Sequence, residues 1–187
     1  MAHTRRFLVS PALARLIRKD QGTQGRVFEG YFANTLQRTH FVRMNPPHCH
    51  LVMVVSGADS QMVEEATELP RSQAQALLDV AHGKIAYECT PLALATGVTA
   101  VLEQVLAAQA FDLLSVSFPS AREAEGFQPP VWVGAEVSGE AAYEKAAMAL
   151  NGEPEVQEPE ISNAALDAVL DLLQSRSSSR YRRDMAA

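Results

Sequence analysis

The sequence predicts an α+β fold dominated by an antiparallel β-sheet, because eight short strand-like runs are interrupted by only a few helical ones. Turn residues separate consecutive runs: Asn45-Pro46-Pro47 and the segment 56–59 are typical hairpin connections. Closing such a sheet removes its two edges, so we expect an eight-stranded antiparallel β-barrel with a few peripheral helices. The predicted strands are Arg5–Ser10, Val27–Ala33, Arg38–Met44, His48–Ser56, Gln61–Leu69, Lys84–Thr90, Val98–Val105 and Phe111–Phe118.

Four short helices are predicted beside these strands. Pro11 suits the first turn of a helix at Ala12–Lys19, and Pro70 opens a second at Arg71–His82. Ser120 can cap a third helix, and a fourth closes the compact region. These last two are expected at Ala121–Gly126 and Glu140–Leu150.

Composition and charge exclude several classes of protein. A formal charge of −6 argues against general nucleic-acid binding, which needs a clustered basic surface. No stretch approaches the ~20 apolar residues that span a bilayer. Two cysteines, Cys49 and Cys89, cannot form a disulfide framework and fit free thiols in a reducing compartment. We therefore expect a cytoplasmic protein that binds neither membranes nor nucleic acid.

The composition changes after residue 150, which we take as the end of the domain 1–150. Residues 151–160 hold two prolines and four glutamates and are predicted to be a linker. Residues 161–174 are predicted to form an amphipathic helix capped by Ser162 or Asn163, and residues 175–187 a disordered basic tail. An amphipathic helix after a linker suits docking to a protein partner or self-association, although packing on its own domain is the alternative. The candidate contact residues are Leu166, Val169, Leu170 and Leu173.

Several segments occur in the order and spacing of one known family. The most specific part is the run Phe118–Phe127, followed by Gln128–Ser138 and Tyr143. The segments upstream agree in order: Arg5–Val9, Glu29–Phe32, Val42–Met44 and Glu68-Leu69-Pro70. On these residues, the region 5–150 resembles the CYTH, or triphosphate tunnel, family.

The resemblance implies a tunnel lined by basic and acidic side chains. In the family, lysines and arginines hold a polyphosphate, while glutamates hold Mg²⁺ or Mn²⁺ and the metal helps to activate a water. Both sets are needed, because a polyanion cannot leave water without cationic partners and hard divalent ions require carboxylate oxygens.

Most positions that the resemblance places in the tunnel lining are altered here. Only Arg6, Arg43 and Glu64 keep the expected charge, and they could form a compensated internal group rather than a ligand site. Glu103 adjoins one altered position, so a shift of register by one residue would restore an acid there. The altered positions are Ala2, Thr4, Phe41, Val54, Met62, Ala66, Tyr87, Cys89, Leu102, Ser115 and Ser117. Together with Val52, the altered positions Phe41, Val54, Tyr87 and Leu102 would give the interior an apolar lining. Such a lining favours a filled barrel over a water-filled tunnel.

We therefore expect a catalytically degenerate CYTH-like protein, a binding or scaffold module without triphosphatase activity or cofactor. Two alternatives remain open. The first is an inorganic triphosphatase that depends on Mg²⁺ or Mn²⁺, with Arg6 and Arg43 binding the anion and Glu64 the metal. The second is a sensor that binds an anion or nucleotide without hydrolysing it.

Three histidines form a separate candidate metal site. His48 and His50 share one face of a strand, and His40 lies on the neighbouring strand, so the three could bind zinc. No fourth ligand is identifiable, and polar residues that keep a hairpin soluble are the explanation we favour.

Overall fold

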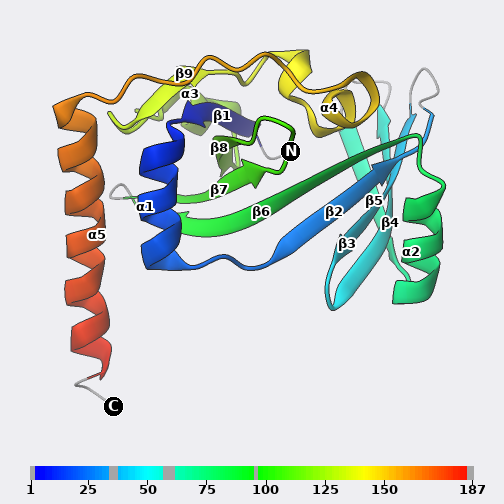
Figure 1. Ribbon diagram of the computed structural model, residues 1–187, viewed down its shortest axis with the longest axis horizontal. Helices are drawn as coiled ribbons and strands as arrows, with labels where there is room; N and C mark the ends of the chain where they lie inside the picture. Colours follow the sequence, from blue (N-terminus) through cyan, green and yellow to red (C-terminus); the bar gives the residue numbers. More distant parts are fainter. Residues whose placement is uncertain (1–2, 34–37, 57–61, 95–96, 185–187) are drawn as a thin grey trace.

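A single antiparallel sheet dominates the computed structural model, which describes residues 3–33, 38–56, 62–94 and 97–184 (Figure 1). Its nine strands follow the order β5-β4-β3-β2-β6-β7-β8-β1-β9. The first eight strands are β1 (His3–Val9), β2 (Arg26–Tyr31), β3 (Arg38–Asn45), β4 (His48–Ser56), β5 (Met62–Glu68), β6 (Gly83–Ala93), β7 (Thr99–Val105) and β8 (Phe111–Phe118). All eight predicted strands are therefore present, and the α+β class is confirmed.

The predicted barrel is wrong in its closure and in its strand number. A ninth strand, β9 (Val133–Glu136), pairs with β1 and leaves β5 and β9 as the two open edges of the sheet. Because β9 occupies the free side of β1, that side is not available to β5. Residues 57–59 of the turn predicted at 56–59 and the altered position Ala2 lie outside the described residues.

The outer face of the sheet carries the larger part of the core. Helix α1 (Pro11–Gln21) buries Leu13, Ala14 and Ile17 against side chains of β1, β7 and β8, and α3 (Ala121–Gly126) covers the same cluster. Helix α2 (Arg71–Asp79) covers β2, β3 and β4, where Gly30 leaves room for the methyl groups of Leu78 and Ala81. These three helices confirm the predicted ones at nearly the same residues.

Helix α5 (Asn163–Asp184) packs alongside α1 on this outer face (Figure 1). The Ser162 hydroxyl accepts a hydrogen bond from the Ala165 amide at 3.1 Å, so Ser162 caps the helix as predicted. The helix continues past its predicted end at residue 174 into the segment expected to be a tail. None of the described helices is long and apolar enough to cross a membrane.

The inner face of the sheet is covered by the segment 137–162, which we call the strap. It contains the 3₁₀ turn η1 (Ala141–Tyr143) and helix α4 (Lys145–Asn151), then runs extended past β9 to α5 (Figure 1). Val137, Tyr143 and Met148 of the strap join one buried cluster with inner-face residues of seven strands. Those inner-face residues are Leu8, Tyr31, Phe41, Val52, Ile85, Val105, Phe111 and Leu113. The expected filled barrel is therefore replaced by an open sheet whose inner face packs in part against the strap.

Candidate functional site

Strand pairing brings the charged residues of five strands onto the inner face. Glu29 pairs with Arg43, which pairs with His50, and Val54 of the same strand pairs with Glu64. Across the sheet, Cys89 pairs with Glu103, and Arg6 pairs with Ser115. Directly opposed residues of antiparallel strands point to the same side. The inner face therefore carries both signs of charge.

Glu29 lies at the centre of the first charged group. Its side chain is 0% exposed, and its carboxylate accepts hydrogen bonds from Arg43 Nε at 2.7 Å, Tyr31 Oη at 2.6 Å and Tyr87 Oη at 2.8 Å. Arg43 also lies 3.6 Å from Glu64, which is half exposed. Glu29 is thus a buried anion with three donors, the arrangement that makes burial of a carboxylate tolerable.

The environment keeps Glu29 ionised. Burial opposes ionisation, but the charges of Lys145 and Arg43 and the hydrogen bonds from Tyr31 and Arg43 outweigh it and lower the pKa of the carboxyl. Burial and the Glu29 charge raise the pKa of both Tyr31 and Tyr87. Both phenols therefore stay protonated and act as donors.

A second charged group fixes the start of α4 to the inner face. Lys145 Nζ lies 2.5 Å from Glu103 Oε1 and 4.0 Å from the centre of the Tyr87 ring. The Ser115 hydroxyl donates to the other Glu103 oxygen at 2.8 Å. The preceding residue, Glu144, pairs with Arg6 at 2.7 Å. Two adjacent residues of the strap therefore complete ion pairs with β1 and β7.

The predicted site residues are brought together in part. Arg43 and Glu64 are neighbours as expected, whereas Arg6 pairs with Glu144. The placement of Leu102 in the tunnel lining is wrong: it is completely buried in the outer core, and Glu103 points inward instead. Sequence reasoning missed Glu29, Tyr31 and Lys145 as site residues, although the acid and tyrosine two apart on one strand were a usable signal.

The three histidines do not meet. Phe41 and Arg43 point inward on β3. Because side chains alternate along a strand, the adjacent residue His40 points to the outer side. His48 and His50 point inward, where His48 lies 3.9 Å from Glu68 at the exposed edge. Within the described ranges, no three His, Cys, Asp or Glu side chains are grouped to hold a metal ion.

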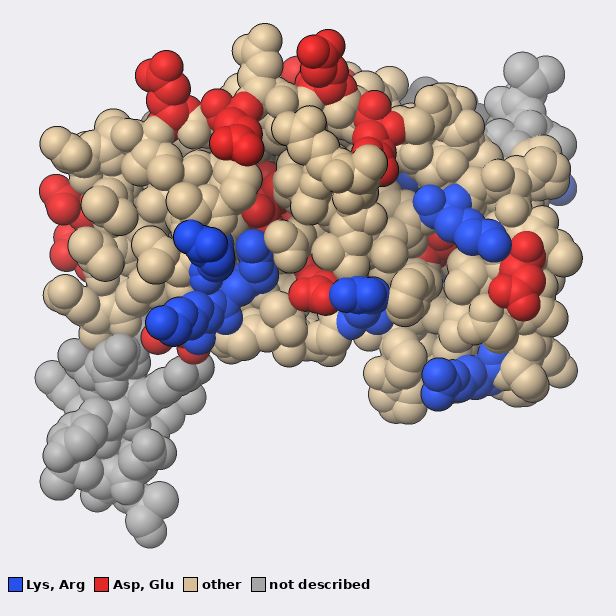
Figure 2. Space-filling view, viewed as in Figure 1, with Lys and Arg blue, Asp and Glu red and all other residues tan. Residues whose placement is uncertain are grey.

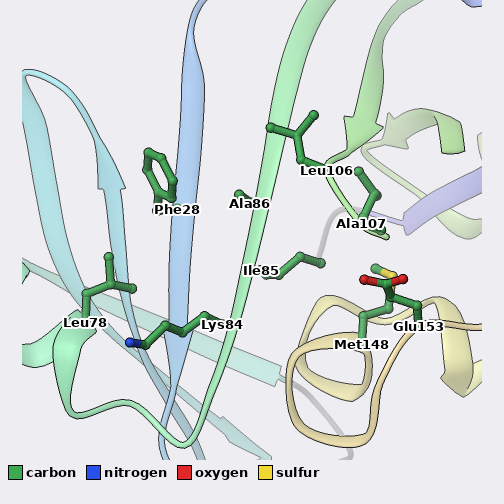
Figure 3. Close-up of a pocket in the computed structure, with 10 residues that line it drawn as sticks. Phe28, Leu78, Lys84, Ile85, Ala86, Leu106, Ala107, Met148 and Glu153 are labelled. Carbon is green, nitrogen blue, oxygen red and sulfur yellow. The ribbon is translucent and has the colours of Figure 1, made fainter. Parts of the chain in front are cut away.

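A small apolar pocket lies beside β6 where β7 ends, away from the charged groups (Figure 3). Its volume is about 230 Å³, and Phe28, Leu78, Ile85 and Met148 are among the apolar residues that line it. Its two charged neighbours already have backbone partners: Lys84 Nζ bonds the Asp79 carbonyl at 3.3 Å, and Glu153 accepts from the Ala108 amide at 3.2 Å. The pocket is unsuited to a polyphosphate.

Comparison with solved structures identifies the class of fold. A structure of the inorganic triphosphatase NE1496 matches with a TM-score of 0.59 and 19% identity, over 80% of this chain and 95% of that one. A second structure, of the hypothetical protein NE1496, gives 0.60 and 20%, over 80% and 98%. A candidate adenylate cyclase from Bacillus halodurans gives 0.52 and 12%, over 67% and 84%. No protein-family model matches the sequence, and no curated protein matches it.

The chain thus has the fold of the CYTH, or triphosphate tunnel, proteins, as the sequence resemblance predicted. In this chain the sheet has nine strands and remains open.

Proposed function

We propose that the chain is a catalytically degenerate CYTH-like protein, a binding module without triphosphatase activity. The observation that supports this most is that each Lys or Arg found on the inner face among the described residues pairs with a carboxylate of the same chain. Arg6 pairs with Glu144, Arg43 with Glu29 and Lys145 with Glu103, all within 2.7 Å. A bound polyphosphate would have to displace these carboxylates, so the cations are poorly available to it.

The carboxylates fit a divalent metal ion poorly. Both oxygens of Glu29 accept hydrogen bonds from Arg43 and two tyrosines, and both oxygens of Glu103 accept from Lys145 and Ser115. Mg²⁺ and Mn²⁺ bind oxygens whose lone pairs point at the metal, whereas these lone pairs point at N–H and O–H donors. The fixed charge of Lys145 would also repel the metal.

Phosphate release from tripolyphosphate with Mg²⁺ or Mn²⁺ tests the proposal. We expect the rate to equal that of buffer for the full chain and for Glu103→Gln. Turnover that disappears in Glu103→Gln or Glu64→Gln, but persists in the surface control Glu125→Gln, would establish an enzyme instead.

The second candidate is an inorganic triphosphatase that depends on Mg²⁺ or Mn²⁺. One arrangement favours it: Arg6, Arg43 and Lys145 share a face with Glu64, whose side chain is 53% exposed. Phosphoryl transfer needs cations and carboxylates on one surface, and the neighbour NE1496 is described as an inorganic triphosphatase. The same phosphate-release assay separates the two candidates.

A binding module also needs a contact surface, and part of α5 can supply one. Leu166 and Leu170 are 37% and 40% exposed, whereas Val169 is buried and Leu173 packs partly on the domain's own core. We propose Leu166 and Leu170 as contacts for a second copy or another protein. Since deletion of α5 would uncover the core, Leu166→Ser with Leu170→Ser is the appropriate variant, and molar mass by light scattering reports self-association.

A further inference from the structure

A second pocket lies between the strap and β9, apart from the charged groups of the inner face. Its volume is about 390 Å³, which suffices for a small organic molecule. The floor is apolar and belongs to the core: Leu8, Val137 and Tyr143 are 5%, 2% and 6% exposed. Such a floor favours an alkyl or aromatic group over a bare ion.

The rim of this pocket is acidic. Glu140, Glu155 and Glu158 line it, all three are exposed, and none forms an ion pair with a residue that the structure describes. Acidic side chains also follow the upper edge of the molecule, where the strap runs, while most basic side chains lie below (Figure 2). The pocket therefore attracts cations and repels anions.

Tyr143 adds a hydrogen-bonding group to the apolar floor of the pocket. Its side chain lines the pocket and packs edge-on against Phe111, with ring centres 6.1 Å apart at 87°. Within the described residues no hydrogen bond is made by its hydroxyl, and this oxygen is not among the described polar atoms that are shut off from solvent, so it is open to a ligand although most of the residue is buried. Burial and the nearby Glu140 charge raise the pKa of this phenol, so it remains a neutral hydroxyl that can accept a hydrogen bond.

The pocket is also held in shape by the strap. At Gly134 of β9, a Cβ atom would lie 2.5 Å from the Pro159 ring, so the absence of a side chain allows the strap to lie directly on this strand. Pro159 in turn fixes the backbone beside Glu158. The backbone that carries Glu158 is therefore in place before any ligand arrives, which lowers the entropic cost of binding.

We propose that this pocket binds a primary amine carried on an alkyl stem. The stem packs on Leu8, Val137 and the Tyr143 ring, and the ammonium group lies among the rim carboxylates with the Tyr143 hydroxyl as an acceptor. The same chemistry is presented by a free alkylamine and by a lysine side chain. This assignment is independent of the proposed loss of triphosphatase activity.

Titration of the full ¹⁵N-labelled chain with hexylamine, followed by NMR, tests this assignment. We expect saturable shifts at residues 133–143 and 155–159, and none with hexanoate, which has the same stem and the opposite charge. The double variant Glu140→Gln/Glu158→Gln should weaken binding about tenfold or more. Tyr143→Phe should weaken it a few-fold, and Glu125→Gln on α3 should bind as the unaltered chain does.

Two further probes identify the source of the amine. Spermidine represents free polyamines, and N-acetyl-lysine methylamide represents a lysine side chain; the tighter of the two names the source. Shifts that do not saturate, equal shifts with hexanoate, or unchanged affinity in a folded double variant would each overturn the assignment.

Discussion

The ammonium group of Lys145 lies 2.5 Å from the carboxylate of Glu103, and this pair joins the first residue of α4 to the inner face of β7. Glu144 forms the adjacent pair with Arg6 of β1. The strap thus supplies both a cation and an anion that pair with charged strand residues of the inner face. These two ion pairs, together with the buried cluster of Val137, Tyr143 and Met148, hold the strap against the inner face of the sheet.

Removal of Arg43 should destabilise the domain strongly. Glu29 is completely buried, so Arg43→Met would leave its carboxylate without the cation that is hydrogen-bonded to it. We expect the free energy of unfolding to fall by about 3 kcal/mol, measured by urea denaturation. The control Arg26→Met removes an arginine that is 52% exposed in its pair with Glu88 and should change stability by less than about 0.5 kcal/mol. Equal effects of the two variants would contradict the role of Arg43.

A side chain at Gly83 should displace α4 from the sheet. A Cβ atom there would lie 2.0 Å from the Ala149 carbonyl oxygen, and backbone cannot yield as a flexible side chain can. Gly83→Ala should cost about 2 kcal/mol and speed amide hydrogen exchange in residues 145–151. Gly126 of α3 has open space around it, so Gly126→Ala should leave that exchange unchanged. Amide hydrogen exchange in residues 145–151 that is no faster in Gly83→Ala than in the unaltered chain would show that α4 is not held at this contact.

Asp112 should make stability depend on pH. Burial raises the pKa of this carboxyl from 3.8 to about 6, although its ion pair with Arg18 acts in the opposite direction. The unfolded chain therefore ionises first as the pH rises, so the contribution of Asp112 to stability falls between about pH 4 and 6 and is level above. Relative to Asp112→Asn, the unaltered chain should lose on the order of 2 kcal/mol between pH 4 and 7.

Urea denaturation at several pH values measures this difference. Subtracting the variant cancels the other titrating groups, including Glu29, whose lowered pKa contributes stability that is lost toward acid pH. A difference that stays constant from pH 4 to 7 would mean that Asp112 has an ordinary pKa.

Two adjacent residues of α5 should differ in how much their substitution destabilises the domain. Val169 is 0% exposed in the outer core, so Val169→Ala should cost on the order of 2 kcal/mol. Leu170 is 40% exposed, so Leu170→Ala should change stability by less than about 0.5 kcal/mol. Thermal unfolding of both variants measures the contrast. A larger loss for Leu170→Ala would mean that α5 packs through a different face.

The strands could be predicted from the sequence because alternation of apolar side chains is a local property. The closure of the sheet could not, because it depends on which strands lie at the edges. β9 has four residues, two of them exposed, so it lacks an alternating pattern that would have indicated a strand.

The charged residues of the inner face could likewise be predicted from the sequence only in part. Arg43 of β3 and Glu64 of β5 could be predicted because the resemblance to the CYTH family places charged residues at these two positions. Leu102 and Glu103 were confused because adjacent residues point to opposite faces, so a register error of one residue exchanges them. Lys145 could not be found, since a helix position alone does not tell which sheet face the helix will cover.

Binding of tripolyphosphate measures the central claim most directly, because it reports whether the inner-face cations are available to an anion. Calorimetric titration of the full chain with tripolyphosphate should give no saturable heat, with or without Mg²⁺, because Arg6, Arg43 and Lys145 are occupied by Glu144, Glu29 and Glu103. Saturable binding that disappears in Lys145→Gln and Arg6→Gln would contradict it, since those cations would then serve a ligand.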